Sequence, residues 1–218
     1  PHADRITWTK GIDKDGRPID PLQNEPGVEK LVCPSVYGSR AANHSAYSPR
    51  TGWWYNTSFE VCAKMRAAPL MPFKEGDFVV SGFLSPERSR TTKPFIAAFD
   101  PLTGKRQWTH ETEVLNASPL MSTWGYLIFG GDPFGNAWAL DARTGTKLWS
   151  CPTGSGISAA PISYAVGGRQ FVAIGSGMSS PPGALVPVLW PELKSRVPPV
   201  GSTLFVFALP QSGKSGKR

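Results

Sequence analysis

The sequence predicts an all-β protein built from repeated antiparallel units, of the β-propeller class. The first observation is a doubled segment: AFDPLTGKRQW at 98–108 returns as ALDARTGTKLW at 139–149, with Ala, Asp, Thr, Gly and Trp at the same offsets. The second is a series of short runs rich in β-branched and aromatic residues, and the third is that no window shows a capped helical period. A repeat of about 40 residues with several short strands is typical of a propeller blade.

Each copy of the doubled segment is expected to form the tip of a β-hairpin. Asp and Gly with Pro or Thr between two β-prone runs form turns, because glycine adopts positive φ without strain. Asp100 and Asp141 are therefore expected to accept hydrogen bonds from turn amides rather than to act as a general base. A weaker third copy, AYSPRTGWWY, occupies 46–55.

The rest of the chain divides into short strands separated by turns. Residues 1–30 are polar and rich in turns, and 31–65 hold a Gly-rich loop followed by a strand at 53–61. The Pro-rich stretch 178–200 is predicted to be a long loop. Residues 1–210 are expected to form one unit and 211–218 a flexible basic tail. The other predicted strands lie at 76–84, 94–100, 106–112, 119–132, 135–141, 147–152, 159–177 (a hairpin around VGG) and 201–210.

Composition excludes several classes of protein. With 40% hydrophobic residues, 23 Gly and 22 Pro in 218 residues, the chain is too apolar for disorder and too rich in Gly and Pro for a helical protein. No apolar run is long enough to span a membrane as a helix. The net charge of +7 comes from scattered residues, which argues against nucleic-acid binding and leaves an acidic protein partner open. The chain lacks an initiating Met and opens as if within a strand, so an N-terminal part is expected to be missing.

Three cysteines leave two arrangements open. Cys33 and Cys62 bracket a loop, a hairpin and a strand that could bring them together, and a disulfide would imply an oxidising compartment. The alternative is a pair of buried free thiols. Cys151 is the odd cysteine, either free or paired with the missing part.

Several segments, in order, resemble one enzyme family. They are WTKGIDKDGRPI, CPSVYG, AYSPRTGWWY, SPLMSTWGYLIFGGDPFGNAWALDARTGTKLW, GSGISAAPISYAVGGRQFVAIGSG and STLFVFALP. With the two hairpin motifs, they resemble the C-terminal part of the pyrroloquinoline quinone (PQQ) dependent alcohol dehydrogenases, a family that includes methanol and ethanol dehydrogenases. The resemblance implies an eight-bladed propeller with tryptophan-docking repeats, of which this chain supplies roughly the C-terminal half. It assigns Trp108 and Trp149 to docking between blades and favours a Cys33–Cys62 disulfide.

The family's chemistry sets further expectations. Its members oxidise an alcohol or aldehyde by passing two electrons to PQQ, with Ca²⁺ or a lanthanide as Lewis acid and an Asp as general base. The metal ligands and the catalytic Asp belong to earlier blades, so no catalytic or metal-binding residue is expected in this chain. The expected partners are the alcohol, the N-terminal portion of the same propeller, and a cytochrome c or membrane quinone as electron acceptor. The expected location is the bacterial periplasm.

Four residues are candidates for contact with the cofactor. Asn43 is the nearest match to a family Asn in the loop after CPS, and His44 follows it; a turn role for either is the alternative. Asn116 stands near a Trp position of the methanol dehydrogenases, and Ser180 lies in SSPP where those enzymes have a Gly-Gly-Trp run. Both departures favour a subfamily with a different, roomier pocket.

Other functions have less support in the residues. The three histidines form no recognisable metal or catalytic cluster, no GxSxG occurs, and the tail that imitates a phosphate loop lacks its first glycine. The main alternative is a non-enzymatic propeller scaffold with the same docking repeats, which would bind no quinone. The Pro-rich insert and the CPS loop favour the enzyme, because scaffold propellers have compact blades.

Overall fold

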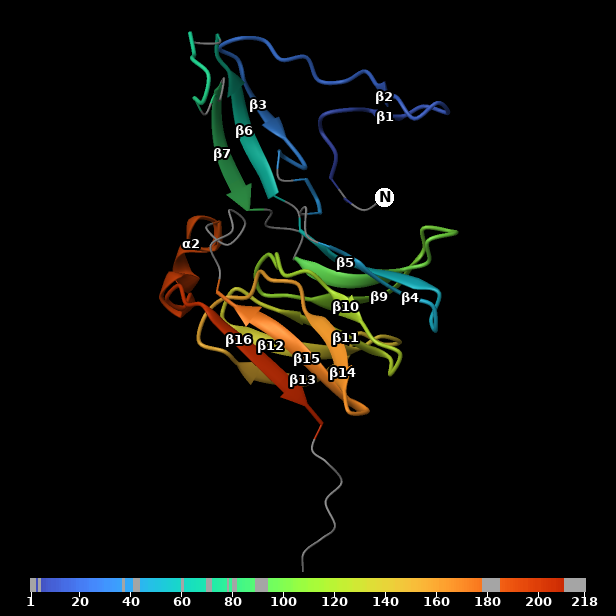
Figure 1. Ribbon diagram of the computed structural model, residues 1–218. Helices are drawn as coiled ribbons and strands as arrows, with labels where there is room; N and C mark the ends of the chain where they lie inside the picture. Colours follow the sequence, from blue (N-terminus) through green and yellow to red (C-terminus); the bar gives the residue numbers. More distant parts are fainter. Residues whose placement is uncertain are drawn as a thin grey trace, which may run out of the picture.

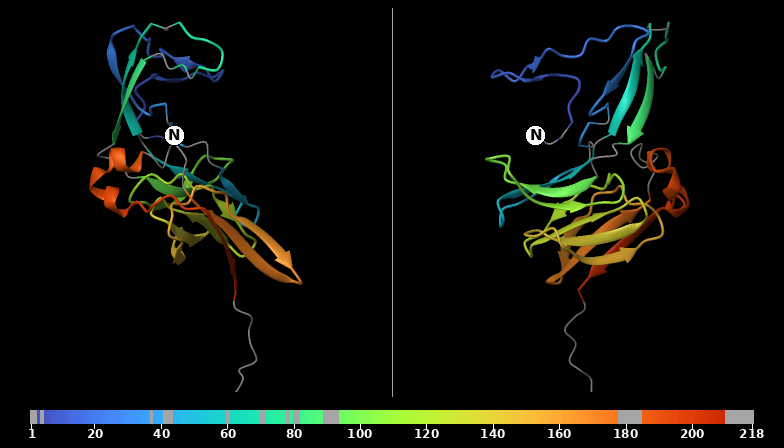
Figure 2. Two further views of the ribbon diagram at one scale, coloured as in Figure 1. Left: turned by 60° about the vertical axis from the view of Figure 1, so that its left-hand side comes forward. Right: turned by 180° about the vertical axis from the view of Figure 1, so that it is seen from behind.

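The computed structural model describes residues 3, 5–36, 38–40, 44–59, 61–69, 72–77, 79, 82–88, 94–177 and 185–209. Three antiparallel sheets lie next to one another as successive blades. A smaller sheet with a long N-terminal arm stands apart from them (Figure 1). Two further views show the same separation between the blades and the smaller sheet (Figure 2). The architecture confirms the predicted all-β propeller class.

The middle blade shows the complete pattern. Its strands β10 (Met121–Ser122), β11 (Leu127–Gly131), β12 (Asn136–Asp141) and β13 (Lys147–Pro152) pair in chain order, each antiparallel to the next. The strand expected at 119–132 is therefore two strands. They are separated by a tip at which Tyr126 has a φ of 61°.

The first blade is interrupted in sequence. It consists of β4 (Ala46–Ser48), β5 (Trp53–Ser58), β8 (Phe95–Phe99) and β9 (Arg106–Glu111). Between β5 and β8 the chain leaves to form the smaller sheet, in which β6 (Val61–Ala67) pairs with both β3 (Glu29–Val32) and β7 (Gly82–Arg88). Before it, β1 (Gly11–Ile12) and β2 (Pro18–Ile19) form a short hairpin around the expected DKDG turn.

The prediction of one continuous strand at 53–61 was wrong. The Ser58 hydroxyl and the Phe59 amide both donate hydrogen bonds to the Ser39 carbonyl, at 2.9 and 3.0 Å, which takes the backbone out of the sheet after Ser58. Strand β6 then begins at Val61 in the other sheet. This bond to a segment about twenty residues earlier has no signal in the local sequence.

The last blade has three strands among the described residues: β14 (Ile162–Val166), β15 (Arg169–Ser176) and β16 (Thr203–Ala208). The expected VGG hairpin joins β14 to β15, with both glycines at positive φ. Val172, Ile174 and Phe207 on one face of the sheet pack against the middle blade. The opposite face is exposed and carries apolar side chains: Ile162, Tyr164, Val166, Leu204 and Val206.

Among its described residues, the stretch expected to be a long loop contains two short helices, which corrects that prediction. They are α2 (Val186–Leu189) and the 3₁₀ helix η1 (Pro191–Arg196), each with a proline in its first two positions. Proline is tolerated there because the first amides of a helix have no partner within it. The helices are held by a core shared with the ends of the blades: Phe59, Val61, Val114, Leu115, Ala117, Leu185, Val186, Leu189 and Trp190.

The three turn motifs adopt hairpin tips, but not all at the same place. Both full copies join the third and fourth strands of their blades, and Gly104 and Gly145 donate to the carbonyls of Asp100 and Asp141 at 2.8 Å. The two carboxylates accept hydrogen bonds from the turn amides, as expected. The weaker copy instead joins β4 to β5, the first two strands of the first blade.

Both motif tryptophans lie against the following blade. The Trp108 indole N–H donates to the Ala142 carbonyl at 2.9 Å, and its ring covers Gly145, where a Cβ would lie 2.5 Å from the indole. The Trp149 ring meets Phe207 of the last blade edge-on, with 4.9 Å between centroids. This is the geometry expected of docking residues, because each indole fills the space between two sheets.

A disulfide joins Cys33 and Cys62, as the resemblance implied. It ties the loop after β3 to the start of β6, so it fixes the smaller sheet close to where the chain leaves the first blade. Cys151 on β13 is a free, partly buried thiol. The predicted tail at 211–218 lies outside the described residues. No helix in the described part of the chain is both long and apolar enough to cross a membrane.

Candidate functional site

The connections between blades gather at one end of the sheets, opposite to the hairpin tips (Figure 1). Because every blade runs through its strands in the same order, the link from the fourth strand to the next blade always returns to this end. The long insertions also start and finish here. Residues 112–120 link the first blade to the middle one, and 153–161 link the middle blade to the last. His44 and Asn116, the candidate site residues that the structure describes, lie at this end.

The structure places His44 beside the start of the middle blade. Its carbonyl accepts a hydrogen bond of 3.0 Å from the Leu120 amide, and its side chain is exposed. Two other candidates, Asn43 and Ser180, lie outside the described residues. The backbone contact brings the segment that follows Asn43 next to the segment that follows Asn116, although the two are more than 70 residues apart in sequence.

Asn116 is buried in the link between the first and middle blades, with an exposed fraction of 3%. Its carbonyl oxygen accepts from the Ser118 amide at 2.8 Å, and the Ser118 hydroxyl accepts from the Gly131 amide at 3.0 Å. These bonds fix the link onto the middle blade. They use the oxygen of the Asn116 amide and leave its NH₂ group as the side available to a ligand.

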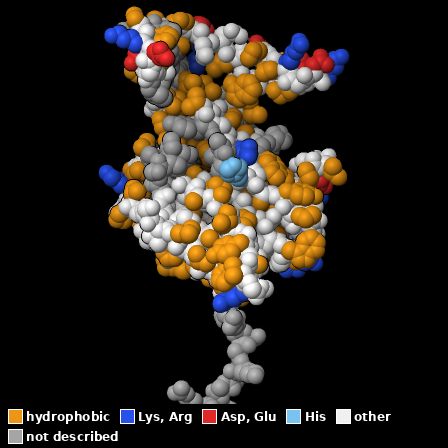
Figure 3. All heavy atoms as spheres, viewed as in Figure 1, with side chains coloured by type: hydrophobic (Ala, Val, Ile, Leu, Met, Phe, Trp, Pro, Cys, Tyr) orange, Lys and Arg blue, Asp and Glu red, His pale blue; other side chains and the backbone are white. Residues whose placement is uncertain are grey.

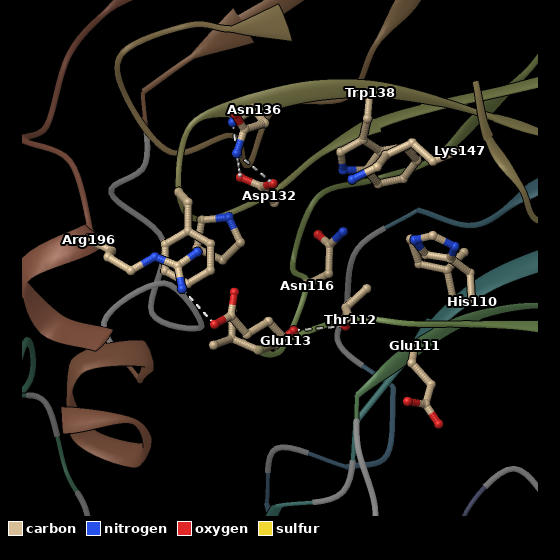
Figure 4. Close-up of a pocket in the computed structure, with 14 residues that line it drawn as sticks. His110, Glu111, Thr112, Glu113, Asn116, Asp132, Asn136, Trp138, Lys147 and Arg196 are labelled. Atoms are coloured by element: carbon tan, nitrogen blue, oxygen red, sulfur yellow. Dashed lines mark hydrogen bonds and ion pairs between the residues drawn. The ribbon is translucent and has the colours of Figure 1, made fainter. Parts of the chain in front are cut away.

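Asn116 also lines a cavity of about 250 Å³ between the first two blades (Figure 4). The other polar lining residues come from β9 and the link after it, from the β11–β12 turn, from the start of β13 and from η1. They are His110, Glu111, Thr112, Glu113, Asp132, Asn136, Lys147 and Arg196. The lining therefore offers both hydrogen-bond donors and acceptors, and charges of both signs.

Two interactions hold the outer side of this cavity. Arg196 of η1 donates to a Glu113 carboxylate oxygen at 2.6 Å, and its guanidinium lies 4.4 Å from the centre of the Phe134 ring. The Asp132 carboxylate accepts from the side-chain amide of Asn136 at 3.0 and 3.2 Å. The first interaction fastens the helical insert to the link between blades, and the second closes the β11–β12 turn.

His110 lines the inner side of the cavity and favours its neutral form. Burial lowers the pKa of the imidazole most strongly, the backbone of Gly145 raises it, and the charge of Lys147 lowers it further. The nearby Asp141 at the hairpin tip is held ionised, because the hydrogen bond from Arg143 lowers its pKa. Within the described residues, no three His, Cys, Asp or Glu side chains are grouped as they would be to hold a metal ion.

A second cavity, of about 480 Å³, opens beside the last blade near the end of the helical insert. It is lined mainly by small residues, among them Ala159, Gly177 and Ser202. The Ser155 hydroxyl donates to the Pro199 carbonyl and accepts from the Gly201 amide, both at 2.9 Å. This serine thus anchors the returning end of the insert to the link before β14.

No family model matches the chain. Individual proteins and solved structures do match it over most of its length. Quinoprotein alcohol dehydrogenase PedH of Pseudomonas putida is 32% identical over 221 residues, which cover 97% of this chain and 36% of the relative. A quinoprotein ethanol dehydrogenase of Pseudomonas putida is 30% identical over the full chain and 36% of the relative. Among solved structures, a europium-containing methanol dehydrogenase superposes with a TM-score of 0.83 at 26% identity, over 94% of this chain and 40% of that one.

This chain is a homologue of one part of the quinoprotein alcohol dehydrogenases. It spans about a third of the length of the curated relatives it matches. A second structure, the quinohemoprotein alcohol dehydrogenase ADHIIG of Pseudomonas putida HK5, gives a TM-score of 0.73 at 25% identity over 95% of this chain. The described blades of this chain therefore have the fold of part of the propeller in these dehydrogenase structures.

Sequence reasoning missed most of the cavity lining. Glu113 and Arg196 lie 83 residues apart, and the segment of Arg196 was expected to be a loop, so nothing in the sequence pointed to their contact. The contact between Asp132 and Asn136 had a local signal that could have been used. DPFGN is a turn sequence, and Asp at the first position of such a turn bonds to groups a few residues later.

Proposed function

We propose that this chain is part of a PQQ-dependent dehydrogenase that oxidises alcohols or aldehydes, and that its loop end forms part of the wall of the cofactor pocket. The observation that carries the proposal is the similarity to quinoprotein alcohol dehydrogenases over 97% of the chain, together with the same blade arrangement. Similarity confined to the docking motifs would support only a propeller. Here it also includes the links and insertions of the loop end.

The described residues fit a quinone cofactor in one specific respect. PQQ presents carbonyl and carboxylate oxygens, which require hydrogen-bond donors. Asn116 is buried with its acceptor oxygen already bonded to the Ser118 amide, so its NH₂ group is the part left to face such an oxygen. His44 offers a second donor from the neighbouring segment, and Asn43 and Ser180, which lie outside the described residues, remain proposed contacts.

In this proposal the bound quinone supplies the acceptor for two electrons, and Ca²⁺ or a lanthanide supplies the Lewis acid. The residues of this chain bind and orient. Asn116 holds a donor at a fixed position because its own oxygen is tied to the following turn. The core beneath α2 and the Glu113–Arg196 ion pair keep the insert over the loop end, where it would limit the access of water to the pocket. The rest of the propeller would supply the metal ligands and the catalytic base.

The proposed setting is the bacterial periplasm, with a cytochrome c or a membrane quinone as electron acceptor. Two relatives carry the acceptor in their names: lupanine 17-hydroxylase [cytochrome c] of a Pseudomonas species and 1-butanol dehydrogenase (cytochrome c) of Thauera butanivorans, each 30% identical to this chain. A Cys33–Cys62 disulfide suits an oxidising compartment. The europium-containing relative supports a lanthanide as well as Ca²⁺ as the metal to test.

The test is reconstitution of the full-length protein with PQQ and either Ca²⁺ or a lanthanide, followed by dye reduction with a panel of alcohols and aldehydes. We expect quinone absorbance to follow the protein and dye to be reduced with at least one metal. Absence of both signals with either metal would overturn the proposal and favour a scaffold propeller.

The role of Asn116 can be separated from its structural bond. Asn116→Asp keeps the oxygen that accepts from Ser118 and removes the NH₂ donor, whereas Asn116→Ala removes both. If the amide contacts the cofactor, both variants bind PQQ more weakly, by about tenfold for one lost hydrogen bond. If Asn116 only fixes the turn, both variants lower thermal stability, Asn116→Asp because it buries a carboxylate, and neither changes PQQ affinity.

A further inference from the structure

The end of the blades opposite to the candidate site carries exposed apolar and cationic side chains on its hairpin tips. Figure 3 shows hydrophobic and basic side chains next to each other along the lower right edge, where the tips lie in Figure 1. We define the tip patch as five residues of the first and middle blades. They are Arg50, Leu102, Lys105, Trp124 and Arg143.

The apolar members of the patch are unusually exposed. Leu102 is 94% exposed and Trp124 is 72% exposed, although large apolar side chains at such positions gain nothing for the fold. The turn around Leu102 does not require it. The sister turn makes the same Gly-to-Asp hydrogen bond, at the same 2.8 Å, with Arg143 at the equivalent position.

Part of the patch is rigid and continuous across two blades. The Arg50 guanidinium lies 5.0 Å from the centre of the Trp124 ring and 3.9 Å from that of Tyr126, and it donates to the Trp124 carbonyl at 3.0 Å. The Arg143 guanidinium also lies over the Tyr126 ring, 4.9 Å from its centre. The exposed indole is therefore held against a cation from the tip of the neighbouring blade.

The charge at the tips is positive. Of the acidic residues at these tips, Asp141 forms an ion pair with Arg143, and Asp100 accepts from the Leu102 and Thr103 amides, so Arg50 and Lys105 outweigh the one charge of Asp100. Lys105 has no ion pair among the described residues. The middle blade has a neighbouring sheet on both sides within this chain, so blades elsewhere in the ring cannot cover Trp124 and Arg143 from the side.

From this arrangement we propose that the tip patch docks the protein onto an anionic lipid surface. Exposed Trp and Leu flanked by Lys and Arg is the composition that enters the headgroup region of a bilayer, where the indole and the aliphatic side chain meet acyl chains and the cations meet phosphates. Trp and Arg are also frequent at the energetic centres of protein interfaces, so an acidic protein is the alternative that the test separates from lipid.

Docking through the tips would direct the loop end, with its cavities and candidate cofactor residues, away from the membrane and toward solvent. The inference is independent of the proposed function, because it concerns the opposite end of the blades. It can be measured on full-length protein whether or not PQQ is bound.

The test is cosedimentation of the full-length protein with vesicles of phosphatidylglycerol and phosphatidylethanolamine, and separately with vesicles of phosphatidylcholine alone. We expect binding to the anionic vesicles that weakens as salt is added, and none to phosphatidylcholine. Lys105→Ala should weaken binding about fivefold, as expected for one cation at an anionic surface. Trp124→Ser should weaken it by on the order of tenfold through lost apolar burial.

Val188→Ser is the matched control, because Val188 is 60% exposed on α2 at the other end of the blades and should not affect binding. Absence of binding to the anionic vesicles would overturn the proposal. Binding that is unchanged in both Lys105→Ala and Trp124→Ser would also overturn it. Capture by immobilised polyglutamate without binding to vesicles would overturn it in favour of an acidic protein partner.

Discussion

The two turn glycines of the repeated motif provide a matched pair for testing the docking tryptophan. Gly104 and Gly145 have φ values of 69° and 72° and donate the same hydrogen bond of 2.8 Å. A Cβ at Gly104 would meet no atom within 4 Å, whereas one at Gly145 would lie 2.5 Å from a carbon of the Trp108 ring. Replacement by alanine therefore has the same backbone cost at both sites but a steric cost only at Gly145.

The expected magnitudes follow from these two terms. Alanine in the left-handed region costs about 1–2 kcal/mol, and we expect Gly104→Ala to lower the free energy of unfolding by that amount. Gly145→Ala adds the displacement of a packed indole, about 1–3 kcal/mol for overpacking. The lost Trp108 N–H bond to Ala142, if the ring is pushed away, adds about 1 kcal/mol. The total for Gly145→Ala is about 2–6 kcal/mol.

The assay is equilibrium urea unfolding of the two variants beside the parent protein, followed by far-UV circular dichroism. A cycle with Trp108→Ala isolates the steric term, because removing the ring should make Gly145→Ala as mild as Gly104→Ala. Equal losses for the two glycine variants in the parent background would refute the reasoning. So would a Gly145→Ala penalty that persists in full without the indole.

Three other predictions follow from the described contacts. Cys33→Ser should destabilise the smaller sheet by about 3–4 kcal/mol for the loop that the bond to Cys62 closes, measured as faster proteolysis within 59–94 at unchanged protection of the middle blade. Because burial lowers the pKa of His110 in the folded state, the unfolded chain binds more protons below the ordinary imidazole pKa. The contribution of His110 to the free energy of unfolding should therefore be fully present above about pH 6.5 and should fall as the pH drops below it. His110→Gln should remove this part of the pH dependence of the melting temperature. Arg196→Ala should lower the free energy of unfolding only slightly, since the ion pair with Glu113 is half-exposed, and added salt should reduce the difference. A large loss of stability that salt does not reduce would contradict this expectation.

The parts of the fold that local chemistry determines were predictable from the sequence. The hairpin tips at Asp100 and Asp141 depend on residues within five positions of each other, and both their turns and their carboxylate bonds are confirmed. The hairpin at 166–169 likewise depends on two adjacent glycines at positive φ. In each case the residue type and its spacing are sufficient to specify the turn.

Features that depend on distant contacts were not predictable in the same way. The end of β5 is set by Ser39, and the helical insert is held by Phe59 and Leu115, all far from the segments they affect. The spacing of apolar residues carries no information on such distant partners. The strand predicted at 53–61 was therefore too long, and 178–200 was expected to lack helices. In the proposed site, the sequence pointed to Asn116, and the structure shows its position and hydrogen bond. Its cavity neighbours Glu113 and Arg196 come together only through the tertiary fold.

The interruption of the first blade has a consequence for how this protein can vary. Ser58 ends β5 and Phe95 begins β8, yet the two are direct register partners, so the chain leaves the sheet and re-enters it at the same point. The middle blade makes the equivalent connection between Gly131 and Asn136 with a short turn. Strands β6 and β7 of the smaller sheet are thus an insertion into a hairpin loop, where they pair with β3 from the segment before β4, and the length and sequence of this insertion can change without altering the strand order of the first blade.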